Sequence, residues 1–455
     1  MKKFIYGFIV FFLFSQITNA CIGDTTGLTN GLDFCSGGSS ILSKEFILYI
    51  IIGFTIFEFL LTKYIGYLNT KNWTTNLPKE LKDIYDEDKY KKSMKYEKTK
   101  YVFGLYSSVF SFVIILLVLL FGGFGWLYNM LSTWTANDIL RTLYFFGMIS
   151  ILQTLISLPL SYYSTFVIED KFGFNKMTKK LFFLDTIKSL VLTFLIGGIL
   201  ISLIVWIYLI VPQTFWLWTW LVMTIFSLFF MMFYSSIIVP IFNKQTPLED
   251  GELRKAIEEF ATKVGFKLDN IFVIDGSKRS SKANAYFSGL GPKKRIVLYD
   301  TLIKDLEVEE LVGVLAHEIG HYKRKHTLQM LIFSIIQTGL MLYILSLTLS
   351  IDSFSQALGA KESSFAVGIL AFGILFTPIS IILGLIGNIL SRKNEYEADE
   401  FAGINYKPKK LKSALIKLSR NNLSNLRPHP AYEFFYYSHP TVLKRLRALD
   451  NINKK

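Results

Sequence analysis

Seven stretches of the chain are almost continuously apolar, and each is long enough to cross a bilayer as a helix, which takes about 20 residues. Polar segments separate them, and the two largest, residues 242–326 and 391–455, mix charged and apolar positions. The apolar stretches lie near residues 45–68, 102–127, 142–168, 182–211, 214–241, 327–350 and 364–390. This pattern predicts a mainly α-helical integral membrane protein whose water-exposed part comes from the two large polar segments.

The loops between these stretches alternate in charge. Residues 21–43, 128–140 and 212–215 contain no Lys or Arg and 351–363 contain only Lys361, whereas 69–101, 169–181, 242–326 and 391–455 are basic. Cytoplasmic loops of membrane proteins are rich in Lys and Arg, so all the basic segments are predicted on the cytoplasmic side. The chain is thereby divided into five helices within 44–241, a cytoplasmic region 242–326, two helices within 327–391, and a cytoplasmic part 392–455.

The N-terminus has the order of features found in secretory signal peptides. Two lysines precede an apolar run over residues 4–14, and small residues follow. Residues 1–20 are therefore interpreted as a signal peptide or, if it is retained, as an N-terminal anchor. Residues 21–43 then form an extracytoplasmic segment, where Cys21 and Cys35 are expected to form a disulfide if the compartment is oxidising.

Composition supports a membrane protein rather than a nucleic-acid-binding one. Charged residues make up 18% of the chain and hydrophobic residues 51%, whereas soluble domains carry about 25% charged residues. The net charge of +14 also fits a nucleic-acid partner, but basic cytoplasmic loops account for it. The lipid bilayer is the expected partner, and no nucleic acid is expected.

Residues 305–325 have a helical pattern of apolar positions with acidic residues early and basic residues late, which suits the helix dipole. This helix carries His317-Glu318-Ile319-Gly320-His321. Residues four apart lie on one face of a helix, so both imidazoles can reach one ion. Zinc favours such ligands and activates water, and Glu318 is placed to take that water's proton. The alternative is a helix surface with two ordinary histidines.

A third ligand is expected after the last apolar stretch, where Glu395-Tyr396-Glu397-Ala398-Asp399 follows. If that helix continues, Glu395 and Asp399 share a face. Glu395 is the predicted ligand, Asp399 is predicted to orient a ligand histidine through its second nitrogen, and Glu397 is the weaker candidate. A solvated acidic turn is the competing interpretation.

Other polar residues carry a weaker signal. His439 precedes Pro440, and Arg445 follows six residues later. Both are candidates to stabilise an oxyanion, although a loop histidine and a solvated arginine explain the spacing equally well. His326 and His429 have no partner pattern and are interpreted as ordinary polar residues. Two short β-branched runs, residues 271–274 and 295–299, predict strands of a small sheet.

Together with the metal motif, several stretches resemble the type I CAAX prenyl proteases, a family of membrane zinc endopeptidases of the gluzincin kind. The similarity extends from about residue 45 to residue 450. The stretches are residues 166–175, Pro240–Lys244 with Thr246–Leu248, Ser281–Phe287, Glu395–Asp399, and Ser438–Pro440 with Arg445.

The resemblance implies seven helices that enclose an intramembrane chamber, with a cytoplasmic zincin-like region facing it. It further implies one zinc ion held by His317, His321 and Glu395, a substrate backbone held by Asn284, and help at the oxyanion from His439 and Arg445. The signal-like N-terminus and the segment 21–43 depart from the family pattern. Together with abundant Lys, Ile and Phe, they predict a bacterial inner-membrane protein with its active site toward the cytoplasm.

The predicted function is a zinc endopeptidase that hydrolyses peptide bonds near the C-terminus of prenylated CAAX-type proteins or related peptides. An alternative within proteolysis is a general quality-control protease for membrane proteins. A seven-helix transporter or receptor is a remote alternative, because it does not explain the ordered set of His317, Glu318, His321 and Glu395.

Overall fold

The computed structural model describes residues 43–74, 76–78, 82, 86–267, 271–289 and 295–452. The expectations for residues 1–20, for residues 21–42 and for the Cys21–Cys35 disulfide lie outside the described residues. The membrane part comprises α2 (Lys44–Thr70), α3 (Glu87–Leu120), α4 (Gly123–Ser132), α5 (Asp138–Tyr163), η2 (Ser164–Glu169), α6 (Asp170–Phe172), α7 (Lys179–Leu192), η3 (Thr193–Gly197), α8 (Gly198–Ile210), α9 (Phe215–Ile237), α10 (Val239–Phe242), α14 (His326–Thr348), α15 (Asp352–Ala357), α16 (Phe365–Leu375) and α17 (Thr377–Asn405).

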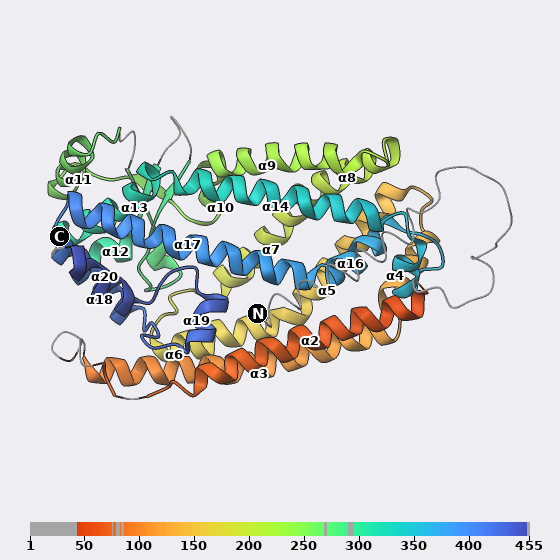
Figure 1. Ribbon diagram of the computed structural model, residues 1–455, viewed down its shortest axis with the longest axis horizontal. Coiled ribbons are helices and arrows are strands. Elements are labelled where there is room, and N and C mark those ends of the chain that lie inside the picture. The colour runs from red at the N-terminus through yellow and green to blue at the C-terminus, as the bar shows by residue number, and fades with distance from the viewer. Residues whose placement is uncertain are drawn as a thin grey trace.

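The predicted mainly helical membrane architecture is confirmed. The described residues contain six helical segments long and apolar enough to cross a membrane, and a seventh if α16 and α17, bent by 57°, form one span. The bend falls just before Pro378, which lacks an amide donor and disfavours a helical residue before it. Figure 1 shows α9 and α14 side by side along one flank and α2 with α3 along the other, while α11, α13, α18 and α20 gather at one end.

The second predicted span, 102–127, has the wrong boundaries. Its helix α3 begins at Glu87, capped by the Asp86 carboxylate, so most of the basic run that we assigned to a loop is helical. At the other end the chain turns at Gly122, whose φ of 62° favours glycine. The next helix then packs tightly, since a Cβ on Gly125 would lie 1.9 Å from the backbone of Gly359.

The water-exposed end combines a four-stranded sheet with helices. The two predicted strands are observed as β2 (Ile271–Ile274) and β4 (Arg295–Tyr299), which pair in parallel, and the sheet has the order β1-β2-β4-β3. Both edge strands are antiparallel to their neighbours: β1 (Gln245–Pro247) and β3 (Ala285–Ser288). The other elements here are α11 (Glu252–Lys263), η4 (Gly276–Lys278), α12 (Asp300–Asp305), α13 (Val308–Lys323), α18 (Pro408–Asn421), α19 (Pro430–Tyr436) and α20 (Val442–Ile452).

The centre of this end is α13, the helix that carries the His-Glu-x-x-His motif. Its apolar residues Leu311, Leu315 and Ile319 are at most 2% exposed, and each such burial contributes about 1.5–3 kcal/mol. The helix starts with a capping box, in which Glu307 and Glu310 each accept the other's backbone amide. α13 is therefore held firmly before the motif begins.

Glu310 is a buried carboxylate that ties α13 to α18. Ser413 Oγ and Lys417 Nζ donate to it over 2.6 and 2.8 Å. Burial raises the pKa of Glu310, but these hydrogen bonds and the Glu307 amide outweigh burial and hold the pKa below its usual value. A lowered folded-state pKa means that the carboxylate stabilises the fold above the unfolded pKa and loses this effect as the pH falls.

We therefore expect Glu310→Gln to destabilise the protein at pH 7 by about 1–3 kcal/mol. The apparent melting temperature in detergent should fall, and the gap from wild type should narrow as the pH drops below the unfolded pKa of about 4.3. Glu309→Gln is the matched control, because Glu309 is 40% exposed and pairs with Lys407 and Lys410 at the surface. Equal losses in the two variants would contradict the assignment.

Candidate active site and metal centre

Two helices that are distant in sequence meet at the motif. α13 carries His317, Glu318 and His321, and α17 runs out of the membrane part to carry Glu395 and Asp399. Gly320 lies in their contact, where a Cβ would come within 3.1 Å of the Ala398 Cα atom and carbonyl oxygen. The missing side chain lets the two backbones approach closely enough for ligands from both helices to converge.

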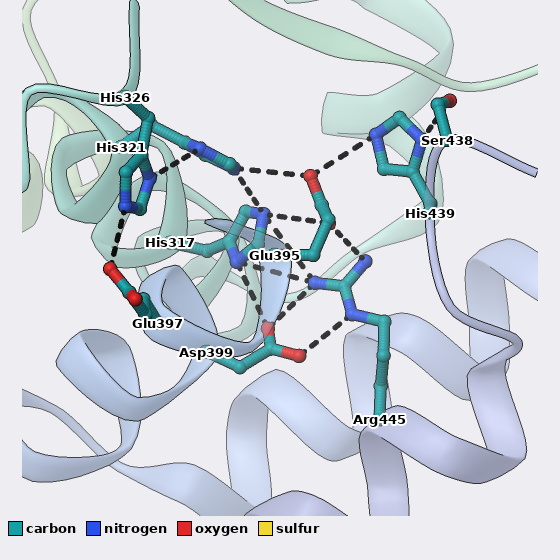
Figure 2. Close-up of polar contacts among 9 residues, drawn as sticks. All are labelled: His317, His321, His326, Glu395, Glu397, Asp399, Ser438, His439 and Arg445. Carbon is teal, nitrogen blue, oxygen red and sulfur yellow. Dashed lines mark hydrogen bonds and ion pairs between the residues drawn. The ribbon is translucent and has the colours of Figure 1, made fainter. Parts of the chain in front are cut away.

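Three side chains converge within the reach of one ion. One ligand atom each from His317, His321 and Glu395 lies within 4.8 Å of the others. The two histidine Nε2 atoms are 3.1 Å apart, His321 Nε2 is 3.2 Å from Glu395 Oε1, and His317 Nε2 is 3.5 Å from Glu395 Oε2 (Figure 2). Figure 2 shows both rings turned toward the Glu395 carboxylate.

These spacings fit zinc. Four ligands about 2.0–2.1 Å from a tetrahedral zinc ion lie about 3.3 Å from one another, close to the 3.1, 3.2 and 3.5 Å observed. Two imidazoles and one carboxylate are also a ligand set that catalytic zinc sites use, with a fourth position for water. His317, His321 and Glu395 can therefore hold a catalytic zinc ion.

Asp399 and Arg445 hold His317 in position through the ring nitrogen that does not face the metal site. Asp399 Oδ1 is 2.9 Å from His317 Nδ1, so the ring donates through Nδ1 and its Nε2 is left for a metal. Arg445, from α20, donates to both Asp399 oxygens through Nε and Nη2 over 2.8 and 2.7 Å, and its Nη1 lies 3.3 Å from Glu395 Oε2. With a side chain only 10% exposed, Arg445 mainly braces the ligand-bearing helices.

The carboxylates dominate the electrostatics around His317. Burial and the nearby Arg445 guanidinium oppose a proton on this ring, but hydrogen bonds to Asp399 and Glu395 outweigh them and raise the pKa of His317 to about 9. The site is therefore strongly attractive to positive charge at the ring. A metal cation that binds there displaces the proton, because only the unprotonated nitrogen is a ligand.

The other predicted site residues, His439, Glu318 and Asn284, lie in different positions relative to the three metal ligands. His439 is 62% exposed and its Nε2 lies 3.2 Å from Glu395 Oε1, at the rim of the ligand set. Glu318 is partly buried beside His317 on α13. Asn284 is exposed and directly precedes the edge strand β3, and none of its hydrogen bonds among the described residues reaches the three metal ligands.

The interpretation of His326 as an ordinary polar residue is wrong. His326 is 4% exposed; its Nδ1 is 3.1 Å from His321 Nδ1 and its Nε2 is 3.1 Å from Glu397 Oε2. His326 lies five residues after His321, so no helical spacing predicted this contact. The signal available in the sequence was a histidine at the start of an apolar span, shortly after the metal motif.

The fold and the site together define a membrane-embedded metallopeptidase, with metal-ligand side chains, an adjacent glutamate and a bundle of membrane-length helices. Residues 66–244 match the family model described as the CAAX prenyl protease N-terminal region with five membrane helices, and residues 247–453 match peptidase family M48. The chain belongs to peptidase family M48, within the CAAX prenyl protease 1 group.

Similarity to characterised relatives covers most of the chain. The Saccharomyces cerevisiae CAAX prenyl protease 1 is 39% identical over 89% of this chain and 96% of its own. The human homologue is 33% identical over 84% of this chain and 90% of its own. The crystal structure of S. mikatae Ste24p matches with a TM-score of 0.85 at 38% identity, over 89% of this chain and 99% of that one. The protein is an integral, multi-pass membrane zinc metalloendopeptidase, which excludes the transporter and receptor interpretations.

Arg445→Lys should weaken zinc binding by about tenfold or more, as changes around metal ligands do. A single ammonium group cannot pair with both Asp399 oxygens and Glu395 as the guanidinium fork does. The affinity is measured by competition with a chelator of known zinc affinity. Arg447→Lys, at an exposed position of the same helix, should leave it unchanged. Unaltered affinity in Arg445→Lys would refute the bracing role.

Proposed function

We propose that the protein binds one zinc ion through His317, His321 and Glu395, and cleaves peptide bonds near the C-terminus of prenylated CAAX-type proteins or related peptides. The observation that carries this proposal is the convergence of these three side chains at tetrahedral spacing, in a chain similar to the yeast CAAX prenyl protease 1 over 89% of its length. The protease region comprises residues 242–326 and 392–455.

The side chains of the site supply proton transfer and charge stabilisation. Zinc, when bound, activates water and polarises the scissile carbonyl. Glu318 takes the proton from the attacking water and delivers it to the leaving amine. His439 donates to the developing oxyanion, a role supported by its exposure and by its 3.2 Å distance from Glu395 Oε1. Arg445 assists by holding Asp399 and Glu395 in place.

An extended substrate adds to the sheet at strand β3. This strand ends the order β1-β2-β4-β3, so among the described residues its outer edge has no neighbouring strand and can form main-chain hydrogen bonds to a peptide. The Phe287 ring packs 5.5 Å from the ring of Tyr322, the residue after His321, which supports a substrate path beside the metal ligands. Asn284, exposed at the start of the strand, orients the peptide backbone.

The membrane location follows the charge pattern of the loops. The basic segments favour an active site on the cytoplasmic side, where C-terminal lipidated tails meet the bilayer surface. The signal-like residues 1–20 and the composition favour a bacterial inner membrane. The chamber that the family resemblance implies within the helices is the proposed place for the lipid chain of the substrate.

Glu318→Gln should retain zinc and lose turnover by at least about 100-fold, because general base catalysis contributes about 10²–10⁴. Zinc content is measured by atomic absorption and turnover by peptide cleavage in detergent. Removing the metal from wild type with a chelator should abolish cleavage, and added zinc should restore it. Full activity of Glu318→Gln at normal zinc content would overturn its role.

Two matched peptides test the substrate class, one with a farnesylated cysteine before the last three residues and one with a free thiol. We expect cleavage after the farnesylated cysteine only, with no cleavage in the Glu318→Gln sample. Equal cleavage of both peptides would replace prenyl processing with general membrane proteolysis. No cleavage of either by zinc-loaded protein would reject the proposed substrate class.

A further inference from the structure

Each ligand histidine uses one ring nitrogen for the metal site, and the environment of the other nitrogen differs between the two rings. For His317 the second nitrogen meets Asp399 directly, with Nδ1 2.9 Å from Oδ1. For His321 the second nitrogen meets another histidine, with Nδ1 3.1 Å from His326 Nδ1. Among the described residues, no carboxylate pairs with His321 Nδ1.

His326 is brought to this place by a turn rather than by helical spacing. α13 ends at Lys323, and Lys325 adopts a left-handed backbone with φ 60° before α14 begins at His326. The turn folds the first residue of α14 back against the last turn of α13. There the His326 side chain is 5% exposed, and its Nε2 lies 3.1 Å from Glu397 Oε2 on α17.

The hydrogen-bond directions along this chain follow from the acceptors. A carboxylate only accepts, so His326 donates through Nε2–H to Glu397. The Nδ1 of a neutral His326 is then an acceptor, and His321 donates to it through Nδ1–H. That tautomer leaves His321 Nε2 unprotonated, the form that a metal requires. In Figure 2 the chain runs continuously from Glu397 through His326 to His321 and on to Glu395.

We propose that His326 and Glu397 are positioning residues for the metal ligand His321, and act on it as Asp399 acts on His317. The proposal rests on the proposed zinc site and deepens it. Glu397 thereby acts on the ligand His321 through His326, whereas Glu395 and Asp399 on the same helix serve as a ligand and as the direct partner of His317. α14, a membrane span, thus begins at a residue that holds the catalytic centre.

A purely structural His–Glu contact between α14 and α17 is the competing explanation, and the chain offers a matched control for it. Glu400 lies three residues after Glu397 on α17, and its Oε2 is 3.6 Å from Arg324 Nη2 at the end of α13. This pair also links α17 to the α13–α14 connection, but none of the ion pairs or side-chain hydrogen bonds among the described residues joins it to a metal ligand. Glu400→Gln therefore removes a comparable carboxylate and leaves the contacts of His326 with His321 and Glu397 in place.

The test measures the zinc affinity of the full-length protein in detergent by chelator competition. His326→Phe should raise the zinc dissociation constant by about 10–100-fold, the usual cost of losing a partner of a ligand histidine. Glu397→Gln should raise it by a smaller factor, because the amide oxygen can still accept from His326. Glu400→Gln should remain within about twofold of wild type. His326→Asn, whose side-chain oxygen can still accept from His321 Nδ1–H, should recover part of the loss.

A spectroscopic readout separates positioning from a general loss of stability. The visible absorption of Co²⁺-loaded protein should shift in His326→Phe and stay unchanged in Glu400→Gln. Wild-type affinity and spectrum in His326→Phe, or equal losses in Glu400→Gln, would overturn the inference. Glu395→Gln distinguishes it from failure of the zinc site itself: if wild type binds zinc and Glu395→Gln does not, an unaffected His326→Phe rejects the positioning role alone.

Discussion

The close contact between α13 and α17 at Gly320 is the constraint on which the site depends. The metal ligands come from two different helices, with Glu395 lying 74 positions after His321 (395 − 321). Their side chains meet because Gly320 leaves room for the backbone of Ala398, 3.1 Å from where a Cβ would stand. Close packing of protein interiors leaves little freedom to move one helix alone. The position of Glu395 relative to His317 and His321 is therefore set by backbone packing rather than by flexible side chains.

Two helices of the membrane part, α14 and α17, also carry residues of the site. α17 begins at the bend beside Pro378 within the bilayer-length segment and carries Glu395, Glu397 and Asp399 at its other end. α14 starts at His326, in contact with His321. Both membrane-length helices thus run directly into the residues that surround the ligands, so the proposed chemistry lies beside the membrane part of the protein.

The buried charges at the site are compensated by oppositely charged and hydrogen-bonding side chains. Glu395 and Asp399 are nearly inaccessible, and isolated charges there would be costly. Arg445 pairs with both, and the His317 and His321 rings lie beside them, whereas Glu395 Oε2 accepts no hydrogen bond among the described residues. Such a network has little tolerance for the removal of one member, since the partner would be left as an unpaired buried charge. The arrangement favours a fixed geometry for the ligands over mobility.

Local periodicity determined much of this protein from the sequence alone. Membrane-length apolar runs predicted the helical bundle, and β-branched runs predicted β2 and β4. The i,i+4 spacing predicted that His317 and His321 share one helix face, and that Glu395 and Asp399 share another. Each of these features depends on neighbours along one element.

The tertiary structure alone decided what depends on contacts between elements. The left-handed turn at Lys325 places His326 beside His321. The predicted span 102–127 ends early because the chain turns at Gly122, and the next helix packs through Gly125 against Gly359. The short strands β1 and β3 lie at the edges of the sheet, beside β2 and β4. Arg445 likewise became a brace because α20 packs against α17, a contact that no spacing within the sequence encodes.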